Sequence, residues 1–187
     1  MYEFGCDVSL RIEKMTTSAI KLIDDFDCGN ENINSLIRTD RSEPHTVTYL
    51  YIDNAEESLV AYVSIACSGI IVDNSEFDGD DAVITPESSI MPAIEIEYYA
   101  IDQEYQSLQF EAGGDAKSTL SYYIFMDMIE RIREISVNIV GARAIVLYAV
   151  PDAVHFYQKS GLRELPPGLS GRTDSFVNRC VPMFIYL

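Results

Sequence analysis

The spacing of hydrophobic and polar residues in the first part of the chain predicts two short helices and an antiparallel pair of strands. Apolar residues follow a helical period over residues 16–30 and again over residues 30–38. Strands are predicted at residues 8–12, 46–53 and 59–72. The polar segment NAEE separates the last two strands, so we expect them to form a hairpin.

A strand with carboxylates on one of its faces is predicted near the middle of the chain. Residues 93–102 alternate apolar side chains with Glu95 and Glu97, and side chains two residues apart in a strand point to the same face. An acidic connection over residues 73–92 precedes this strand, and a long loop over residues 103–115 follows it.

The last part of the chain predicts a crossover from strand through helix to strand. The longest helix is expected at residues 118–141, with Ser118 as its N-cap and Gly141 as its C′ residue. Beyond it, the pattern predicts a buried strand, a short helix and a closing strand at residues 144–150, 151–161 and 181–187. This order is typical of a mixed α/β protein, and the length suits a single domain over residues 1–187.

The composition is that of a globular protein, with 48% hydrophobic and 23% charged residues. The four cysteines are scattered without a CxxC pair, which predicts reduced thiols and no metal site. No apolar run reaches the ~20 residues of a membrane span, and the N-terminal residues lack the pattern of a secretory signal. We therefore expect a cytoplasmic protein.

The net charge of the chain affects which ligands are expected. A net charge of −17 repels phosphate backbones, so a nucleic-acid ligand is disfavoured. An acidic surface suits a cationic ligand such as an amine, although most of these charges also serve solubility.

Three segments resemble the Gcn5-related N-acetyltransferase superfamily, and in particular its small bacterial-type members. They are FDCGNENINSLIR, EIEYYAIDQEYQ and AVHFYQKSGL, which occur in the order of the family's motifs. The resemblance implies a mixed, mostly antiparallel central sheet with helices on both faces and with the fourth and fifth strands splayed apart. The glycines of the usual phosphate loop come several residues late in this chain, as Gly113 and Gly114.

The resemblance also implies an acetyl transfer to an amine, with acetyl-CoA as co-substrate. Glu95 matches a general-base glutamate, and Glu97 on the same face is the second candidate. Tyr157 matches a tyrosine that protonates the departing thiolate, and we expect it to face the cleft while Phe156 enters the core. The residues expected at the acetyl-CoA site are Tyr99, Ala100, Ile101, Gln106, Gly113, Gly114, Lys117, Ser118, Ala153 and Phe156.

Three functions are compatible with these observations. The first is an N-acetyltransferase for a small cationic molecule or a protein amino group. The second is a toxin-type acetyltransferase that acts on aminoacyl-tRNA and is paired with an antitoxin, which the segment FDCGN favours and the negative charge opposes. The third is a non-catalytic member that binds an acyl-CoA or a protein partner. A homodimer is compatible with each of them.

Overall fold

The computed structural model describes residues 2–3, 8–16, 19–39, 45–72, 89–111, 117–171 and 179–187. Its contacts divide the chain into two compact units. The first unit combines Met1–Ala66 with Glu97–Met128, and the second combines Cys67–Ile96 with Ile129–Leu187. Three elements contribute residues to both units, namely the strands β4 (Leu59–Val72) and β5 (Ser89–Ile101) and the helix α3 (Leu120–Ile135).

The strands of the first unit form an antiparallel meander. Its members are β1 (Tyr2–Glu3), β2 (Ser9–Lys14), β3 (Thr46–Asp53) and the first half of β4. The strands β3 and β4 are paired from Thr46↔Ala66 onward, with a register shift at Tyr51/Ile52. This pairing confirms the hairpin that the polar segment NAEE predicts.

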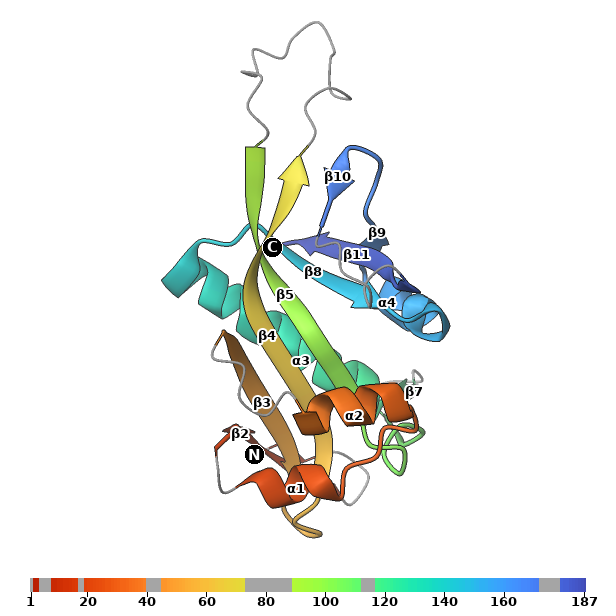
Figure 1. Ribbon diagram of the computed structural model, residues 1–187. Coiled ribbons are helices and arrows are strands. Elements are labelled where there is room, and N and C mark those ends of the chain that lie inside the picture. The colour runs from red at the N-terminus through yellow and green to blue at the C-terminus, as the bar shows by residue number, and fades with distance from the viewer. Residues whose placement is uncertain are drawn as a thin grey trace, which may run out of the picture. The chain divides into compact units, whose positions relative to one another are not determined.

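Helices cover both faces of the strands in the first unit (Figure 1). The helices α1 (Ile20–Asp24) and α2 (Glu31–Thr39) bury Ile23 and Ile37 in one core with Leu50 of β3. On the opposite face, the Tyr51 hydroxyl donates a 2.7 Å hydrogen bond to Asp127 Oδ2 of α3. The strand period of two explains this division, because Leu50 and Tyr51 are neighbours that point to opposite faces.

The second unit contains the parallel pair of the fold. The second half of α3 continues into a π-helical turn (Ser136–Val140), and the strand β8 (Ala144–Ala149) then pairs in parallel with β5 from Ala93↔Ala144 to Ile96↔Leu147. The closing strand β11 (Val181–Tyr186) lies antiparallel to β8. Two short strands, β9 (Arg163–Glu164) and β10 (Leu169–Ser170), pair with β11 and β4.

A short helical segment follows β8. It begins as a 3₁₀ turn (Pro151–Ala153) and continues as α4 (Val154–Lys159). Pro151 starts it and Gly161, with a φ of 93°, ends it, as the sequence predicts. Gly141 ends the long helix with a φ of 65°, which confirms its predicted role.

Three sequence predictions need correction. The central strand begins at Ser89 and not at residue 93. The expected loop after β5 contains a hairpin of β6 (Gln109–Glu111) and β7 (Lys117–Thr119), so Ser118 lies in a strand. The N-cap of α3 is Thr119, whose Oγ1 accepts a 3.2 Å hydrogen bond from the Tyr122 N–H, because the ladder with β6 holds Ser118 outside the helix.

No helix in the described part of the chain is both long enough and apolar enough to cross a lipid bilayer.

Candidate functional site

The two glutamates of β5 differ in their exposure to solvent. Glu95 is 3% exposed, and its Oε2 accepts a 3.0 Å hydrogen bond from the hydroxyl of Ser68 within the second unit. Glu97, in the first unit, is half-buried. A direct contact with an acceptor molecule is therefore open to Glu97, whereas Glu95 can exchange a proton only through an intervening group.

The end of β5 is largely buried. Ala100 and Ile101 are buried, and the ring of Tyr99 packs edge-on against Phe125 at 5.1 Å between centroids. The hydroxyl of Tyr99 donates a hydrogen bond to the carbonyl of Ser121. The side chain of Tyr99 thus helps to fix the start of α3.

The structure brings the first two family-like segments together. Asp27 of the FDCGN segment accepts hydrogen bonds from the Gly29 N–H and from Asn34 Nδ2, both at 2.7 Å. These two donors hold the pKa of the Asp27 carboxyl below its ordinary value. Asp102, directly after β5, accepts a 3.0 Å hydrogen bond from the Asp27 N–H, so the two segments are joined across 75 residues.

Gln106 was expected at the acetyl-CoA site, and its amide takes part in this junction. Its Nε2 donates to the carbonyls of Cys28 and Ile101, both at 2.9 Å. The Gln106 side chain therefore links the FDCGN segment to the last residue of β5. The sequence could not indicate this role, because the two segments meet only in the folded chain.

The remaining residues expected to bind phosphate lie in the sequence between β6 and the start of α3. Gly113 and Gly114 fall outside the described residues. Lys117 and Ser118 belong to β7, where Ser118 pairs with Phe110. The long helix begins two residues later, at Leu120, so neither Lys117 nor Ser118 occupies a helix N-terminus.

The helix α4 carries the candidate general acid. Tyr157 is 7% exposed, whereas Phe156 is half-buried, which reverses the predicted orientation of the two rings. The 3₁₀ turn explains the difference, because it advances about 120° per residue and not about 100°, and so changes the phase of the helix that follows. Burial raises the pKa of Tyr157, and Cys180 nearby contributes in the same direction. Ala153 ends the 3₁₀ turn and is half-buried.

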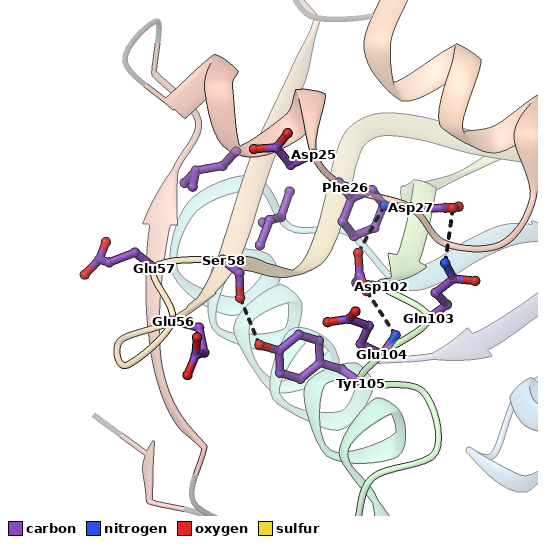
Figure 2. Close-up of a pocket in the computed structure, with 12 residues that line it drawn as sticks. Asp25, Phe26, Asp27, Glu56, Glu57, Ser58, Asp102, Gln103, Glu104 and Tyr105 are labelled. Atoms are coloured by element: carbon purple, nitrogen blue, oxygen red, sulfur yellow. Dashed lines mark hydrogen bonds between the residues drawn. The ribbon is translucent and has the colours of Figure 1, made fainter.

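A pocket of about 310 Å³ opens in the first unit, next to the joined segments (Figure 2). It is rich in carboxylates, and those that line it are Asp25, Asp27, Glu56, Glu57, Asp102 and Glu104. Arg11 offsets one of these charges through a 2.7 Å ion pair with Glu57. On the wall, the hydroxyls of Tyr105 and Ser58 lie 2.8 Å apart, and burial raises the pKa of Tyr105.

The negative charge is unevenly distributed along the chain. Residues 1–129 carry 6 Lys and Arg against 25 Asp and Glu, a net charge of −19. Residues 130–187 carry 7 Lys and Arg against 5 Asp and Glu, a net charge of +2, which accounts for the total of −17. The exposed cationic side chains of Lys159 and Arg163 belong to this second part.

Among the described residues, the sheet contains one parallel pair, β5 and β8, and the helix α3 lies between these strands in sequence. This arrangement is the fold class that the sequence predicts, that of the Gcn5-related N-acetyltransferases. No protein-family model matches the sequence, and no curated protein matches it significantly.

Solved structures match the fold over nearly its whole length. A structure of AtaTR bound with AcCoA is 17% identical and covers 95% of this chain and 93% of its own, with a TM-score of 0.67. AtaT complexed with acetyl-methionyl-tRNAfMet is 18% identical and covers 95% of both chains, with a TM-score of 0.64. A KacTA–DNA complex is 17% identical and covers 95% of this chain and 93% of its own, with a TM-score of 0.63. At these identities the matches establish the fold.

Proposed function

We propose that the protein is an acetyl-CoA-dependent N-acetyltransferase of the toxin type, and that it acetylates the α-amino group of an aminoacyl-tRNA. The observation that carries this proposal is the match over nearly the whole chain to AtaT, which has been solved with AcCoA and with acetyl-methionyl-tRNAfMet. The segment FDCGN also favours a toxin-type acetyltransferase, because it resembles the opening motif of that branch of the family. The same comparison supports an antitoxin partner, because a tyrosine-to-phenylalanine mutant of the AtaT toxin has been solved bound to the C-terminus of the antitoxin AtaR.

The end of β5 fits acetyl-CoA as a co-substrate that is held by main-chain groups. The parallel pairs between β5 and β8 run to Ile96↔Leu147, and β5 continues to Ile101. Ala100 and Ile101 at this end are buried, so their side chains offer a ligand little contact. Acetyl-CoA supplies the acetyl group as a thioester, and Gly113 and Gly114 are the proposed contacts of its phosphates.

A carboxylate of β5 is the proposed general base. The amino group of an acceptor must lose a proton before it becomes a nucleophile. Glu97 is accessible enough to take this proton directly, and Glu95 would take it through a water molecule. The difference in exposure favours Glu97 as the group that contacts the acceptor.

Tyr157 is the proposed general acid. Its raised pKa keeps the phenol protonated throughout the neutral range, so the proton is available to the departing thiolate. Burial makes the same phenol a weaker acid, so proton donation depends on the negative charge that develops on sulfur. Tyrosine-to-phenylalanine mutants of AtaT and KacT are among the matched structures, and Tyr157→Phe is the same kind of substitution.

The uneven charge removes part of the objection to an RNA acceptor. Phosphate groups are repelled by the first 129 residues, which carry a charge of −19, and not by the last 58, which carry +2. We propose that an aminoacyl-tRNA approaches the exposed side of α4, where Lys159 lies.

The acidic pocket favours a second candidate function, the acetylation of a small cationic amine. Six carboxylates line this pocket of about 310 Å³, which is large enough to admit a small polyamine. Such a molecule would be attracted electrostatically, and its own amino group would be the acceptor.

The test is acetyl transfer from ¹⁴C-labelled acetyl-CoA to a panel of acceptors that contains methionyl-tRNA, other aminoacyl-tRNAs, spermidine and a lysine peptide. Label transfer to an aminoacyl-tRNA, at a rate well above that for spermidine, supports the proposal. Transfer to spermidine alone supports the second candidate. Binding of acetyl-CoA by calorimetry without transfer to any acceptor would overturn both and leave the non-catalytic alternative.

A further inference from the structure

We infer that Asp27 is a positioning residue for acetyl-CoA binding. Its hydrogen bonds hold the turn after β5 and thereby position the β6–β7 hairpin that follows; this inference rests on the proposed function. Asp27 acts through a group of hydrogen bonds that we call the lock. Its members are Asp27, Asn34, Asp102, Gln103 and Gln106. All five belong to the first unit, and all five lie in the two segments that resemble family motifs.

The Asp27 carboxylate is the centre of the lock. Its Oδ1 accepts from Gly29 and Asn34 at 2.7 Å, and its Oδ2 accepts from Gln103 Nε2 at 3.2 Å. Asn34 is only 2% exposed and uses its other amide atom, Oδ1, to accept from the Cys28 N–H at 3.0 Å. The carboxylate therefore joins the start of α2 to the residues that follow β5.

Main-chain groups complete the lock in both directions. The Asp27 N–H donates to Asp102 Oδ2, and the Gln103 N–H donates to the Asp27 carbonyl at 2.9 Å. Figure 2 shows Asp27, Asp102 and Gln103 facing one another at this point. Gln106 adds its two bonds to the carbonyls of Cys28 and Ile101. The turn after β5 is thus bound on one side to the FDCGN segment and on the other to β5 itself.

The position of the lock along the chain connects it to the proposed site. The locked turn leads directly into the β6–β7 hairpin, which stands where the family has its phosphate loop. The hairpin returns to α3 next to the same turn, because the Leu120 N–H donates to the Leu108 carbonyl at 2.9 Å. A shift of the turn would therefore shift the hairpin and the start of α3 together. The lock is consequently expected to affect the binding of acetyl-CoA rather than the chemical step.

The test compares Asp27→Ala with Asp27→Asn by calorimetry with acetyl-CoA and by steady-state kinetics. Asp27→Ala removes the acceptor of three hydrogen bonds, and we expect the Kd and KM for acetyl-CoA to rise about tenfold with kcat within about twofold. Asp27→Asn keeps an acceptor for Gly29 and Asn34, and the Gln103 amide can rotate to pair with the new NH₂ group. We expect this variant to bind within about twofold of wild type.

The exposed Ser107, which lies on the same turn, supplies a matched control, and Ser107→Ala should bind acetyl-CoA as wild type does. If Asp27→Ala proves too unstable to purify, Asp102→Ala removes the acceptor of the Asp27 N–H and should give the same rise in Kd.

Each outcome has one consequence. A tenfold rise for Asp27→Ala with near wild-type binding for Asp27→Asn supports the lock. A lower melting temperature for Asp27→Ala with an unchanged Kd means a merely structural role and overturns the inference, while the proposed function stands. If both variants lose affinity for acetyl-CoA equally, the effect comes from the negative charge of Asp27, and the inference is also overturned. A wild-type protein that does not bind acetyl-CoA overturns the proposed function and, with it, this inference.

Discussion

Replacing Tyr157 by phenylalanine tests the proposed general acid, because the change keeps the ring and removes one hydroxyl. The ring is 7% exposed and packs edge-on against Phe156 at 5.2 Å between centroids, and these contacts remain in the variant. The hydroxyl lies close enough to Cys180 for the two groups to interact electrostatically. The variant should therefore fold as the wild type does.

The expected effect on catalysis is larger than the expected effect on stability. Loss of one buried hydroxyl interaction costs about 1 kcal/mol, which lowers the melting temperature of a chain of this size by about 2–4 °C. Loss of a general acid lowers turnover by about 100-fold, equivalent to about 2.7 kcal/mol in the barrier. Because domains are stable by about 5–15 kcal/mol, the variant remains almost entirely folded at 25 °C and the loss of turnover cannot come from unfolding.

The assay for Tyr157→Phe is the release of CoA thiol, measured in parallel with thermal unfolding. Cys67 is exposed and would react with the thiol reagent, so wild type and variant are both compared in a Cys67→Ser background. A fall in kcat of about 100-fold with an unchanged Kd for acetyl-CoA supports the assignment. Turnover within about twofold of wild type, together with a lower melting temperature, would refute it and leave Tyr157 as a core residue.

Alkaline unfolding gives a second measurement on Tyr157 that does not depend on activity. The folded state raises the pKa of this phenol above its unfolded value of about 10. The neutral phenol therefore contributes stability that is fully present below pH ~10 and is lost as the pH rises further. We expect the free energy of unfolding to fall more steeply above pH ~10 in the wild type than in Tyr157→Phe, and parallel curves would contradict the assigned burial.

Three further predictions concern the base, the acceptor and the cap of α3. Glu97→Gln should lower kcat by about 100-fold and remove the acidic limb of the pH–rate profile, and a normal profile in this variant with the loss seen in Glu95→Gln would move the role to Glu95. Lys159→Glu should raise the KM for aminoacyl-tRNA several-fold, and more at low salt, while Lys21→Glu in the acidic part of the chain should not; equal effects would contradict the proposed approach of the RNA. Thr119→Ala should lower the free energy of unfolding by about 1 kcal/mol in urea titrations, and no change would mean that the observed cap adds nothing to stability.

The elements with a long regular pattern could be predicted from the sequence. The strand β4 and the helix α3 contain 14 and 16 residues. Their hydrophobic patterns are therefore long enough to be recognised even where single residues depart from them. Turn residues located the ends of helices for the same local reason, as Gly141 and Gly161 illustrate.

Short elements that depend on a distant partner could not be predicted. The strands β6 and β7 contain three residues each, which is too few for an alternating pattern, and their pairing displaced the expected N-cap from Ser118 to Thr119. The phase of Tyr157 failed for a related reason, since one 3₁₀ turn before α4 rotates every later side chain. In both cases a short segment with unexpected local geometry placed a site residue, Ser118 or Tyr157, in an environment other than the predicted one.

The sequence resemblance alone could not separate residues that act on a substrate from residues that hold the fold. Gln106 occupies a motif position expected at the acetyl-CoA site, yet its amide nitrogen donates to two backbone carbonyls of the protein, those of Cys28 and Ile101. Asp27 and Asp102 are carboxylates beside an acidic pocket, yet each accepts backbone N–H donors from the turns around it. Each of the two segments supplies the hydrogen-bonding groups that the other requires, so a chain of this fold that retains one of them gains from retaining the other. The joint presence of FDCGN and DQEYQ is therefore explained by their contact, and the proposal of acetyl transfer rests on the match to the solved structures of AtaT.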